Sequence, residues 1–315
     1  MKHIFIINPQ AGSGNAAKWL PEKIAAAFAD APELCELYLT QKEGDATDYV
    51  VRRCQAEADG ESLCFYACGG DGTLNEVAEG TLRFPFAQVG VVPCGTGNDF
   101  VKNFPDRNFL DIAAQRDGEP MTIDLLHCNG RIAVNLCNAG LDANVARDIH
   151  IFKRLPLLGG PSAYIVSLVK NFFGRLGEQA VVRLDGVEIT TGSLLLLVIA
   201  NGKYYGGSFT GAPEASVEDG LIDVSIVPTL SRPKILSVLP RYQKGRHTTD
   251  EDLRRIVTYR KCSKIEVEYS RPVSLCIDGE AMITSRITAT VAQGGLHVHL
   301  PAIHTRAASP ATVTV

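Results

Sequence analysis

The sequence has no apolar run long enough to span a membrane. The longest run, Leu194–Ala200, has the length of a buried strand, whereas a membrane-spanning helix needs about 18–20 apolar residues. We therefore expect a soluble protein, which can still dock on a membrane surface.

An excess of one charge is also missing. The chain has 31 basic and 35 acidic residues and a net charge of −4, so we expect no nucleic-acid partner. Because 45% of the 315 residues are hydrophobic and only 21% are charged, the chain can bury a core and is not a disordered protein. Its length suits one large domain or two ordinary ones.

Paired cysteine motifs are absent. The nine cysteines form no CxxC pair, and most of them lie in apolar, strand-like runs. We interpret them as small core residues in a reducing cytosol, not as disulfides or zinc ligands. The expected localisation is therefore cytoplasmic.

Strands and helices alternate over roughly the first 120 residues. Continuous apolar strands separated by helices predict a Rossmann-like domain whose parallel sheet is buried on both faces. The expected strands are Ile4–Asn8, Cys35–Thr40, Leu63–Cys68 and Val89–Pro93, and the expected helices are Ala16–Phe28, Ala46–Ala58 and one that opens over Leu74–Gly80.

The pattern changes after about Met121 and becomes mostly strand-like, which predicts a second, largely antiparallel β domain. We expect domains at residues 1–125 and 126–302, a loose tail at 303–315, and a chain end that can pack back on the first domain. Helices are expected at Ala163–Phe173 and Lys234–Gln243. The expected strands are Met121–His127, Arg131–Asn138, Ala180–Leu184, Ser193–Asn201, Leu221–Val227, Lys264–Tyr269, Val273–Ile277, Ile287–Val291 and Leu296–Leu300.

A glycine-rich turn follows the first expected strand and contains Asn8, Pro9 and Gly12. Such a turn between a strand and a helix exposes backbone N–H groups that attract phosphate. It matches neither the Walker A nor the GxGxxG pattern. An ordinary strand–helix turn explains this segment equally well.

The second turn, Gly69–Glu76, follows a buried strand and places three glycines around Asp71. The glycines let the backbone approach a ligand closely. A carboxylate beside phosphates is repulsive unless a cation or a proton transfer intervenes, so Asp71 indicates bound Mg²⁺ or general-base work. The alternative, a plain helix N-cap, does not explain the flanking glycines.

The third turn, Pro93–Phe100, also follows a strand. Ligands of open α/β sheets bind at the carboxyl ends of the strands. Three such turns can therefore converge on one nucleotide triphosphate, and their combination is far more specific than any single turn.

These motifs resemble the catalytic domain of the diacylglycerol kinase and sphingosine kinase family, and most closely the bacterial soluble lipid kinases. The segments Asn138–Asp142, Glu218–Asp223 and Ile277–Glu280 also fit, so the resemblance covers nearly the whole chain. The GGDGT turn is shared with NAD kinases and phosphofructokinases. The turn Gly95–Phe100 and the late Asp-Gly-Glu element separate the lipid kinases from those.

The resemblance implies that the first domain binds ATP with Mg²⁺ and that the second holds the acceptor. It implies a structural Mg²⁺ site formed by Ser216, Asp219 and Leu221, although an Asp-Gly hairpin turn explains this segment too. The expected catalytic residues are Glu280 as the first choice for proton acceptor, Asp278 as the second, and Asp71. The implied nucleotide contacts are Asn8, Pro9, Gly12, Thr40, Gly69, Gly70, Asp71, Gly72, Thr73, Leu74, Asn75, Glu76, Gly95, Thr96, Asn98 and Asp99.

The expected enzyme is therefore a phosphotransferase of lipid metabolism and phospholipid biosynthesis, which phosphorylates diacylglycerol or a related lipid alcohol. A kinase of NAD or sugars, or a nucleotide sensor without activity, remains the alternative. The apolar segment Leu155–Phe173, flanked by Lys153, Arg154 and Arg175, fits either a peripheral contact with the membrane or a core helix. The sequence leaves the oligomeric state open.

Overall fold

A computed structural model describes residues 1–12, 14–57, 60–152 and 160–303 of the chain. The expected loose tail lies outside these residues from position 304 onward, as do Lys153, Arg154 and the start of the expected membrane segment. The described helices include none long and apolar enough to cross a membrane.

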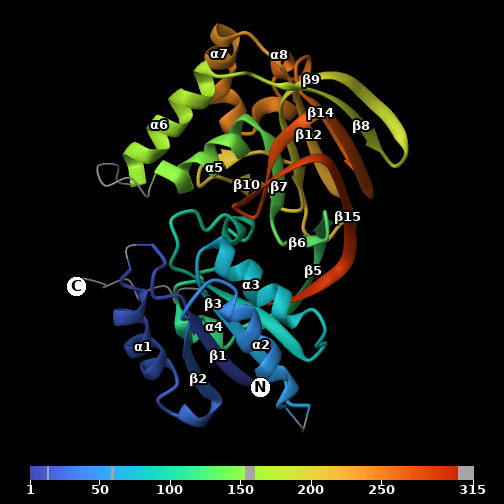
Figure 1. The fold of residues 1–315 in the computed structure, drawn as a ribbon. Coiled ribbons are helices and arrows are strands. Elements are labelled where there is room, and N and C mark those ends of the chain that lie inside the picture. Colours follow the sequence, from blue (N-terminus) through green and yellow to red (C-terminus); the bar gives the residue numbers. More distant parts are fainter. Residues whose placement is uncertain (13, 58–59, 153–159, 304–315) are drawn as a thin grey trace, which may run out of the picture.

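The N-terminal half is a parallel sheet with the strand order β4-β3-β1-β2. Side chains of β1 alternate between its two faces: Ile4 and Ile6 pack toward α2 and α3, and Phe5 and Ile7 toward α1, as a strand repeat of two requires. Figure 1 shows these helices around the sheet. The elements are β1 (Lys2–Ile7), α1 (Ala16–Ala27), η1 (Pro32–Leu34), β2 (Cys35–Leu39), α2 (Asp45–Gln55), β3 (Leu63–Gly69), α3 (Asp71–Thr81), β4 (Ala87–Pro93), η2 (Phe100–Asn103) and α4 (Ile112–Arg116).

The C-terminal half is built from antiparallel strands. Along β9, Leu197 and Ile199 join the core between the strands, whereas Leu196 and Val198 face a second core covered by α6 and α7. The elements are β5 (Glu119–Cys128), β6 (Arg131–Ala133), β7 (Leu136–Gly140), α5 (Leu141–Phe152), α6 (Gly160–Phe173), β8 (Glu178–Leu184), β9 (Val187–Ala200), β10 (Tyr204–Tyr205), β11 (Phe209–Thr210), β12 (Ile222–Pro228), α7 (Arg232–Gln243), η3 (Arg246–Thr248), α8 (Glu251–Arg254), β13 (Thr258–Cys262), β14 (Lys264–Ile277) and β15 (Glu280–Leu300).

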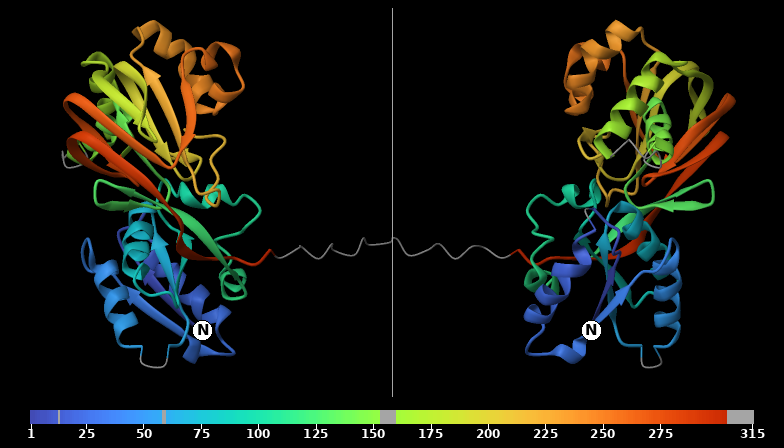
Figure 2. Two further views of the ribbon diagram at one scale, coloured as in Figure 1. Left: turned by 90° about the vertical axis from the view of Figure 1, so that its right-hand side faces the viewer. Right: turned by 60° about the vertical axis from the view of Figure 1, so that its left-hand side comes forward.

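The last strand, β15, connects the two halves. It pairs with β14 near its start and with β5 further on, and Val298 then lies beside Val89 of the parallel strand β4. Figures 1 and 2 show β15 running from the upper to the lower part of the molecule. The predicted class, a Rossmann-like α/β part followed by a mostly antiparallel β part, is confirmed.

Several local expectations were wrong. The strands expected at Lys264–Tyr269 and Val273–Ile277 are one strand, β14, and those expected at Ile287–Val291 and Leu296–Leu300 both belong to β15. The strand expected at Arg131–Asn138 is split into β6 and β7, because backbone N–H groups between them donate to the side chain of Asp278 instead of to a neighbouring strand. The helix α5 was not expected. It begins directly after Gly140, whose φ of 107° turns the chain out of β7.

Candidate active site

The three glycine-rich turns meet at the carboxyl ends of β1, β3 and β4. A Cβ atom on Gly12 would lie 2.3 Å from the carbonyl oxygen of Cys94, and one on Gly95 would lie 2.4 Å from the Cα atom of Gly70. Larger residues at these positions would separate the turns. The glycines therefore permit the convergence that the sequence predicts.

Asp71 begins α3 at the centre of these turns. Its Oδ1 atom accepts hydrogen bonds from the backbone N–H groups of Asp99 (2.9 Å) and Phe100 (3.3 Å). Burial raises the pKa of Asp71 to about 6, and repulsion from the carboxylates of Asp99 and Asp278 adds to the rise. A group with this pKa is suited to accept a proton near neutral pH.

Asp99 connects the third turn to the C-terminal half. Both of its carboxylate oxygens lie 3.1 Å from the backbone nitrogen of Gly207, which donates to them, and Lys102 donates to Oδ1 at 2.5 Å. The ammonium group of Lys102 also donates to the carbonyl oxygen of Gly207 at 2.8 Å. These contacts fix the third turn against the loop between β10 and β11.

Asp278 accepts four hydrogen bonds. Oδ2 accepts from the N–H of Val134 (2.6 Å) and from the amide side chain of Asn75 (2.9 Å), and Oδ1 accepts from the N–H groups of Asn135 (3.1 Å) and Leu136 (3.0 Å). Burial raises the pKa of this carboxyl group, whereas its hydrogen bonds oppose the rise. Asp278 thus connects Asn75 of the N-terminal half to the backbone of the C-terminal half. Because both of its oxygens accept hydrogen bonds, it is less available as a proton acceptor.

Glu280 lies two residues further, at the start of β15, and forms an ion pair with Arg131. The side chains of Glu280 and Arg131 are 40% and 41% exposed. The structure thus brings Asp71, Asp278 and Glu280 to one cavity, with the Glu280 carboxylate already paired with a cation.

The cavity has a volume of about 1060 Å³ and is lined by residues of both halves. Nine of the predicted nucleotide contacts line it: Asn8, Gly12, Gly70, Asp71, Gly72, Thr73, Gly95, Thr96 and Asp99. The other predicted contacts are not among its lining residues, namely Pro9, Thr40, Gly69, Leu74, Asn75, Glu76 and Asn98.

Several of these other residues form hydrogen bonds that hold the cavity-lining segments in place. The side chain of Asn98 closes the third turn, because it accepts from the N–H of Gly95 (3.0 Å) and donates to the same residue's carbonyl oxygen (2.7 Å). Glu76 accepts from the N–H of Ala46 at 3.3 Å and so ties α3 to α2. Thr40 donates its N–H to the carbonyl oxygen of Ile7 at the end of β1.

The positively charged side chain of Lys261 lies at the predicted structural magnesium site. The ammonium group of Lys261 lies 2.7 Å from Asp219 Oδ2 and 2.7 Å from Asp223 Oδ2, and the other oxygen of Asp219 accepts the N–H of Leu221. Among the described residues, no group of three or more His, Cys, Asp or Glu side chains is placed to hold a metal ion. A Mg²⁺ ion bound by Ser216, Asp219 and Leu221 therefore has to compete with Lys261.

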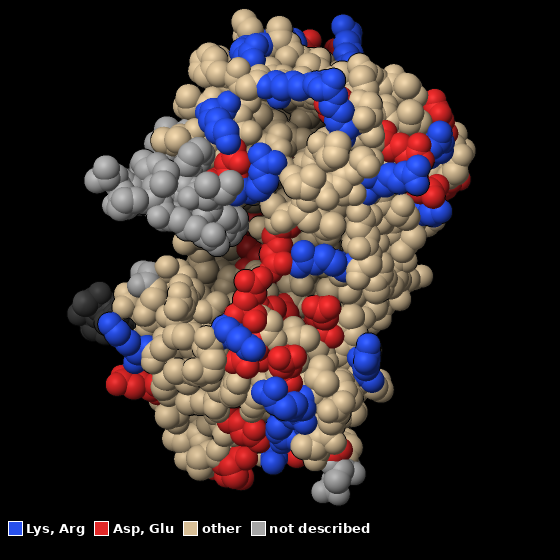
Figure 3. All heavy atoms as spheres, in the orientation of Figure 1, with Lys and Arg blue, Asp and Glu red and all other residues tan. Residues whose placement is uncertain are grey.

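The far part of the cavity is apolar and was not predicted. It is lined by aliphatic and aromatic side chains from several elements, including Val145, Val169, Phe172, Leu195, Leu196, Val227, Ile235 and Leu239. Figure 3 shows acidic side chains gathered in the hollow between the upper and lower parts of the molecule. One end of the cavity is thus polar and acidic, and the other is apolar.

Comparison with known proteins gives consistent matches over most of the chain. The diacylglycerol kinase catalytic domain matches residues 2–128, and the YegS C-terminal NAD kinase beta sandwich-like domain matches residues 135–305. A YegS-like lipid kinase of Pseudomonas aeruginosa is 30% identical over 292 residues, which cover 89% of this chain and 90% of that protein. The diacylglycerol kinase of Bacillus subtilis is 26% identical over 279 residues, with 87% and 88% covered.

Solved structures show the same fold. The crystal structure of a diacylglycerol kinase from Bacillus anthracis covers 94% of this chain and 96% of its own, with a TM-score of 0.65 at 19% identity. Another structure from the same organism reaches a TM-score of 0.70 at 22% identity over the same shares of the two chains.

Proposed function

The chain belongs to the family of YegS-like lipid kinases with a diacylglycerol kinase catalytic domain, and from this premise we propose that it transfers the γ-phosphoryl group of ATP to a hydroxyl group of diacylglycerol or a related lipid alcohol. Residues 1–125 would bind the nucleotide and residues 126–302 the acceptor. The reaction takes place where the two parts meet.

The observation that carries this proposal is the continuity of the cavity. Glycine turns and carboxylates line one end, and hydrocarbon side chains line the other. A lipid alcohol has the matching polarity, because its hydroxyl belongs beside the nucleotide and its chains belong among apolar side chains. A sugar or a dinucleotide would leave the apolar end without a partner.

The turns would bind the phosphates of ATP through backbone N–H groups, aided by the N-terminus of α3. The Oδ2 atom of Asp71 is the carboxylate oxygen of this residue that the hydrogen bonds from Asp99 and Phe100 leave open. A Mg²⁺ ion accompanying ATP would neutralise phosphate charge, and this open oxygen of Asp71 would remain available to accept a proton.

Asp71 is the best candidate to take the proton of the acceptor hydroxyl. Its raised pKa keeps it basic enough at neutral pH, whereas Asp278 is saturated with hydrogen bonds and Glu280 is paired with Arg131. Asp278 would instead position the loop from Val134 to Leu136 beside the reacting groups. This ranking reverses the order expected from the sequence.

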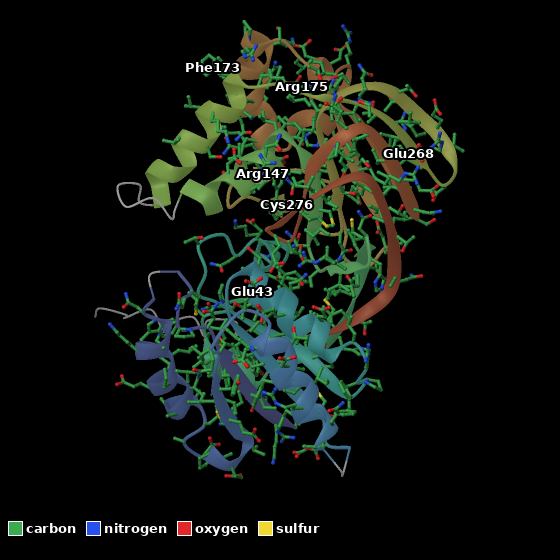
Figure 4. The ribbon with its side chains drawn as sticks, in the orientation of Figure 1. Glu43, Arg147, Phe173, Arg175, Glu268 and Cys276 are labelled. Atoms are coloured by element: carbon green, nitrogen blue, oxygen red, sulfur yellow. The ribbon has the colours of Figure 1, made fainter. Side chains whose placement is uncertain are left out.

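A membrane-facing rim around the apolar end would admit the lipid. Val169 of α6 and Leu236 of α7 line the cavity and are 50% and 59% exposed, so the cavity opens between these helices. Phe173 is 70% exposed at the end of α6, next to Arg175 (Figure 4). Exposed apolar side chains beside cations fit an anionic lipid surface.

The test is transfer of radiolabelled phosphate from ATP to acceptors in mixed detergent micelles. Diacylglycerol, sphingosine, phosphatidylglycerol, NAD and a sugar phosphate are compared, with the variant Asp71→Asn as the inactive control. We expect a labelled product that partitions into organic solvent with the wild-type protein only. Labelling of NAD or of the sugar phosphate alone would refute the proposal, and ATP binding without any labelled product would indicate a nucleotide sensor.

A further inference from the structure

The cavity contains two buried polar atoms that have no hydrogen-bond partner within the described part of the chain. They are Oδ2 of Asp142, at the start of α5, and the hydroxyl of Tyr242, near the end of α7. Both residues line the cavity. Buried polar atoms are nearly always paired in proteins, so each of these two atoms is available to a bound molecule.

The two residues lie in a poorly hydrated environment. Burial raises the pKa of Asp142 to about 7, and the neighbouring side chain of Asn138, the N–H of Ala143 and the hydroxyl of Tyr205 limit the rise. Burial also raises the pKa of Tyr242, the charge of Asp142 adds to that effect, and the neighbouring hydroxyl of Tyr205 opposes it. Asp142 is therefore largely ionised slightly above neutral pH, and Tyr242 keeps its proton.

The sheet register connects these atoms to the reaction centre. Cys276 and Asn138 stand opposite each other on β14 and β7, and both line the cavity. Cys276 precedes Asp278 by two residues, and Asp142 follows Asn138 by four. Because β7 pairs antiparallel with β14, the segment from Asn138 to Asp142 runs away from Asp278. Figure 4 shows Cys276 at the level where the two halves meet.

An ionised carboxylate only accepts hydrogen bonds, whereas a tyrosine hydroxyl both donates and accepts. The two atoms together therefore match a group that donates to one and accepts from the other, such as a hydroxyl. The oxygens next to the free hydroxyl of a diacylglycerol belong to esters and can only accept. A phosphodiester at the same place would be repelled by the carboxylate.

We propose that Asp142 and Tyr242 form a hydrogen-bonding subsite that selects uncharged lipid alcohols with a second hydroxyl or an N–H group near the phosphorylated hydroxyl. This inference rests on the proposed function and makes its acceptor class narrower. A monoacylglycerol or an amide-linked lipid fits the subsite better than a diacylglycerol does.

The test uses two acceptors of equal chain length in the same mixed micelles. One is 1-monooleoylglycerol, and the other is the monooleoyl ester of 1,3-propanediol, which lacks only the middle hydroxyl. We expect the wild-type kcat/KM to be about tenfold or more higher for the glycerol ester, because the acceptor without the middle hydroxyl leaves buried hydrogen-bonding groups unpaired. Equilibrium binding of radiolabelled forms of both acceptors is measured in parallel.

Three variants locate the effect. Asp142→Leu and Tyr242→Phe should bring the ratio of the two kcat/KM values close to one. The control Tyr49→Phe removes the hydroxyl of a partly buried tyrosine of α2 that does not line the cavity and should keep the wild-type ratio. Because each ratio is measured on one protein preparation, a partly unfolded variant does not distort it.

The two proposals fail in different ways. Equal use of both acceptors by the wild-type protein would overturn the subsite and leave the lipid kinase function intact. If neither acceptor nor any other lipid alcohol is phosphorylated, the proposed function is wrong. In that case the binding measurements test the subsite proposal. Equal binding of both acceptors would overturn it. Tighter binding of the glycerol ester, lost in Asp142→Leu, would support it.

Discussion

Replacing Asp71 by asparagine should make the protein more stable and inactive at the same time. Both hydrogen bonds that Asp71 accepts end at Oδ1, and the side-chain oxygen of asparagine can accept the same two. The substitution removes a buried negative charge that lies near the carboxylates of Asp99 and Asp278. The variant therefore keeps both hydrogen bonds and no longer has the unfavourable burial of a negative charge, so its free energy of unfolding should be higher.

The magnitude follows from the pKa of Asp71, which rises from its ordinary value of 3.8 to about 6 in the folded protein. Each pKa unit corresponds to about 1.4 kcal/mol, so ionised Asp71 lowers the free energy of unfolding by about 3 kcal/mol at pH 7.5. Because the folded state holds this proton more tightly, the cost develops as the pH rises from about 4 to about 6. We expect Asp71→Asn to gain about 2–3 kcal/mol at pH 7.5 and less than about 1 kcal/mol at pH 4.

Urea unfolding of the nucleotide-free protein at both pH values measures this gain. The matched control is Asp185→Asn, because Asp185 also accepts its hydrogen bonds at Oδ1 but is exposed, and the hydroxyl of Ser263 lowers its pKa. This control should give no gain at either pH.

Activity is the second half of the prediction. Loss of a general base should lower kcat/KM by about 10²–10⁴-fold, and the wild-type kcat/KM should fall below about pH 6 as Asp71 is protonated. A variant that is no more stable than the wild type at pH 7.5, or whose gain persists at pH 4, would refute the buried-charge reasoning. Activity within tenfold of the wild type would refute the assigned role of Asp71.

Further substitutions test other parts of the molecule. Glu280→Gln should lower kcat/KM less than tenfold, because the carboxylate is half exposed and paired with Arg131; a loss as large as that of Asp71→Asn would return the proton-acceptor role to Glu280. Asp278→Asn places an NH2 group against two of the four hydrogen-bond donors and should lower the free energy of unfolding in urea by about 2–4 kcal/mol. An unchanged free energy of unfolding would show that these donors do not depend on the carboxylate. Lys261→Met should lower the Mg²⁺ concentration needed to raise the thermal unfolding midpoint, and Asp219→Ala should remove this effect of Mg²⁺. If Mg²⁺ does not change the unfolding midpoint of Lys261→Met, no metal ion binds at this loop. Phe173→Glu should weaken sedimentation with vesicles of anionic lipid, whereas Leu37→Glu, at an exposed position of β2, should not; equal binding of both variants would contradict the membrane-facing rim.

The sequence identified the parts of the site that depend on local backbone chemistry. The turns at Gly12, Gly70 and Gly95 were found because close backbone approach requires glycine wherever it occurs. Asp71 was found because a carboxylate between glycines has no purely structural explanation. The parallel and antiparallel halves followed from the change in apolar pattern near Met121, since strand periodicity is also a local property.

Pairings between distant segments could not be predicted in this way. Nothing in the order of residues indicates that Lys261 reaches Asp219, that Arg131 reaches Glu280, or that four donors surround Asp278. The ranking of the three catalytic candidates therefore changed once these partners were known.

By itself, then, the sequence determined the fold class, the glycine-rich turns and the family, because each depends on residue types at fixed short spacings. Only the tertiary structure showed which of the three carboxylates already have partners and where the apolar end of the cavity lies. It also placed Asp142 and Tyr242, a hundred residues apart in the chain, in one cavity, each with one buried oxygen that has no hydrogen-bond partner among the described residues. The availability of a side chain depends on its burial and its partners, and these exist only after distant segments have packed together.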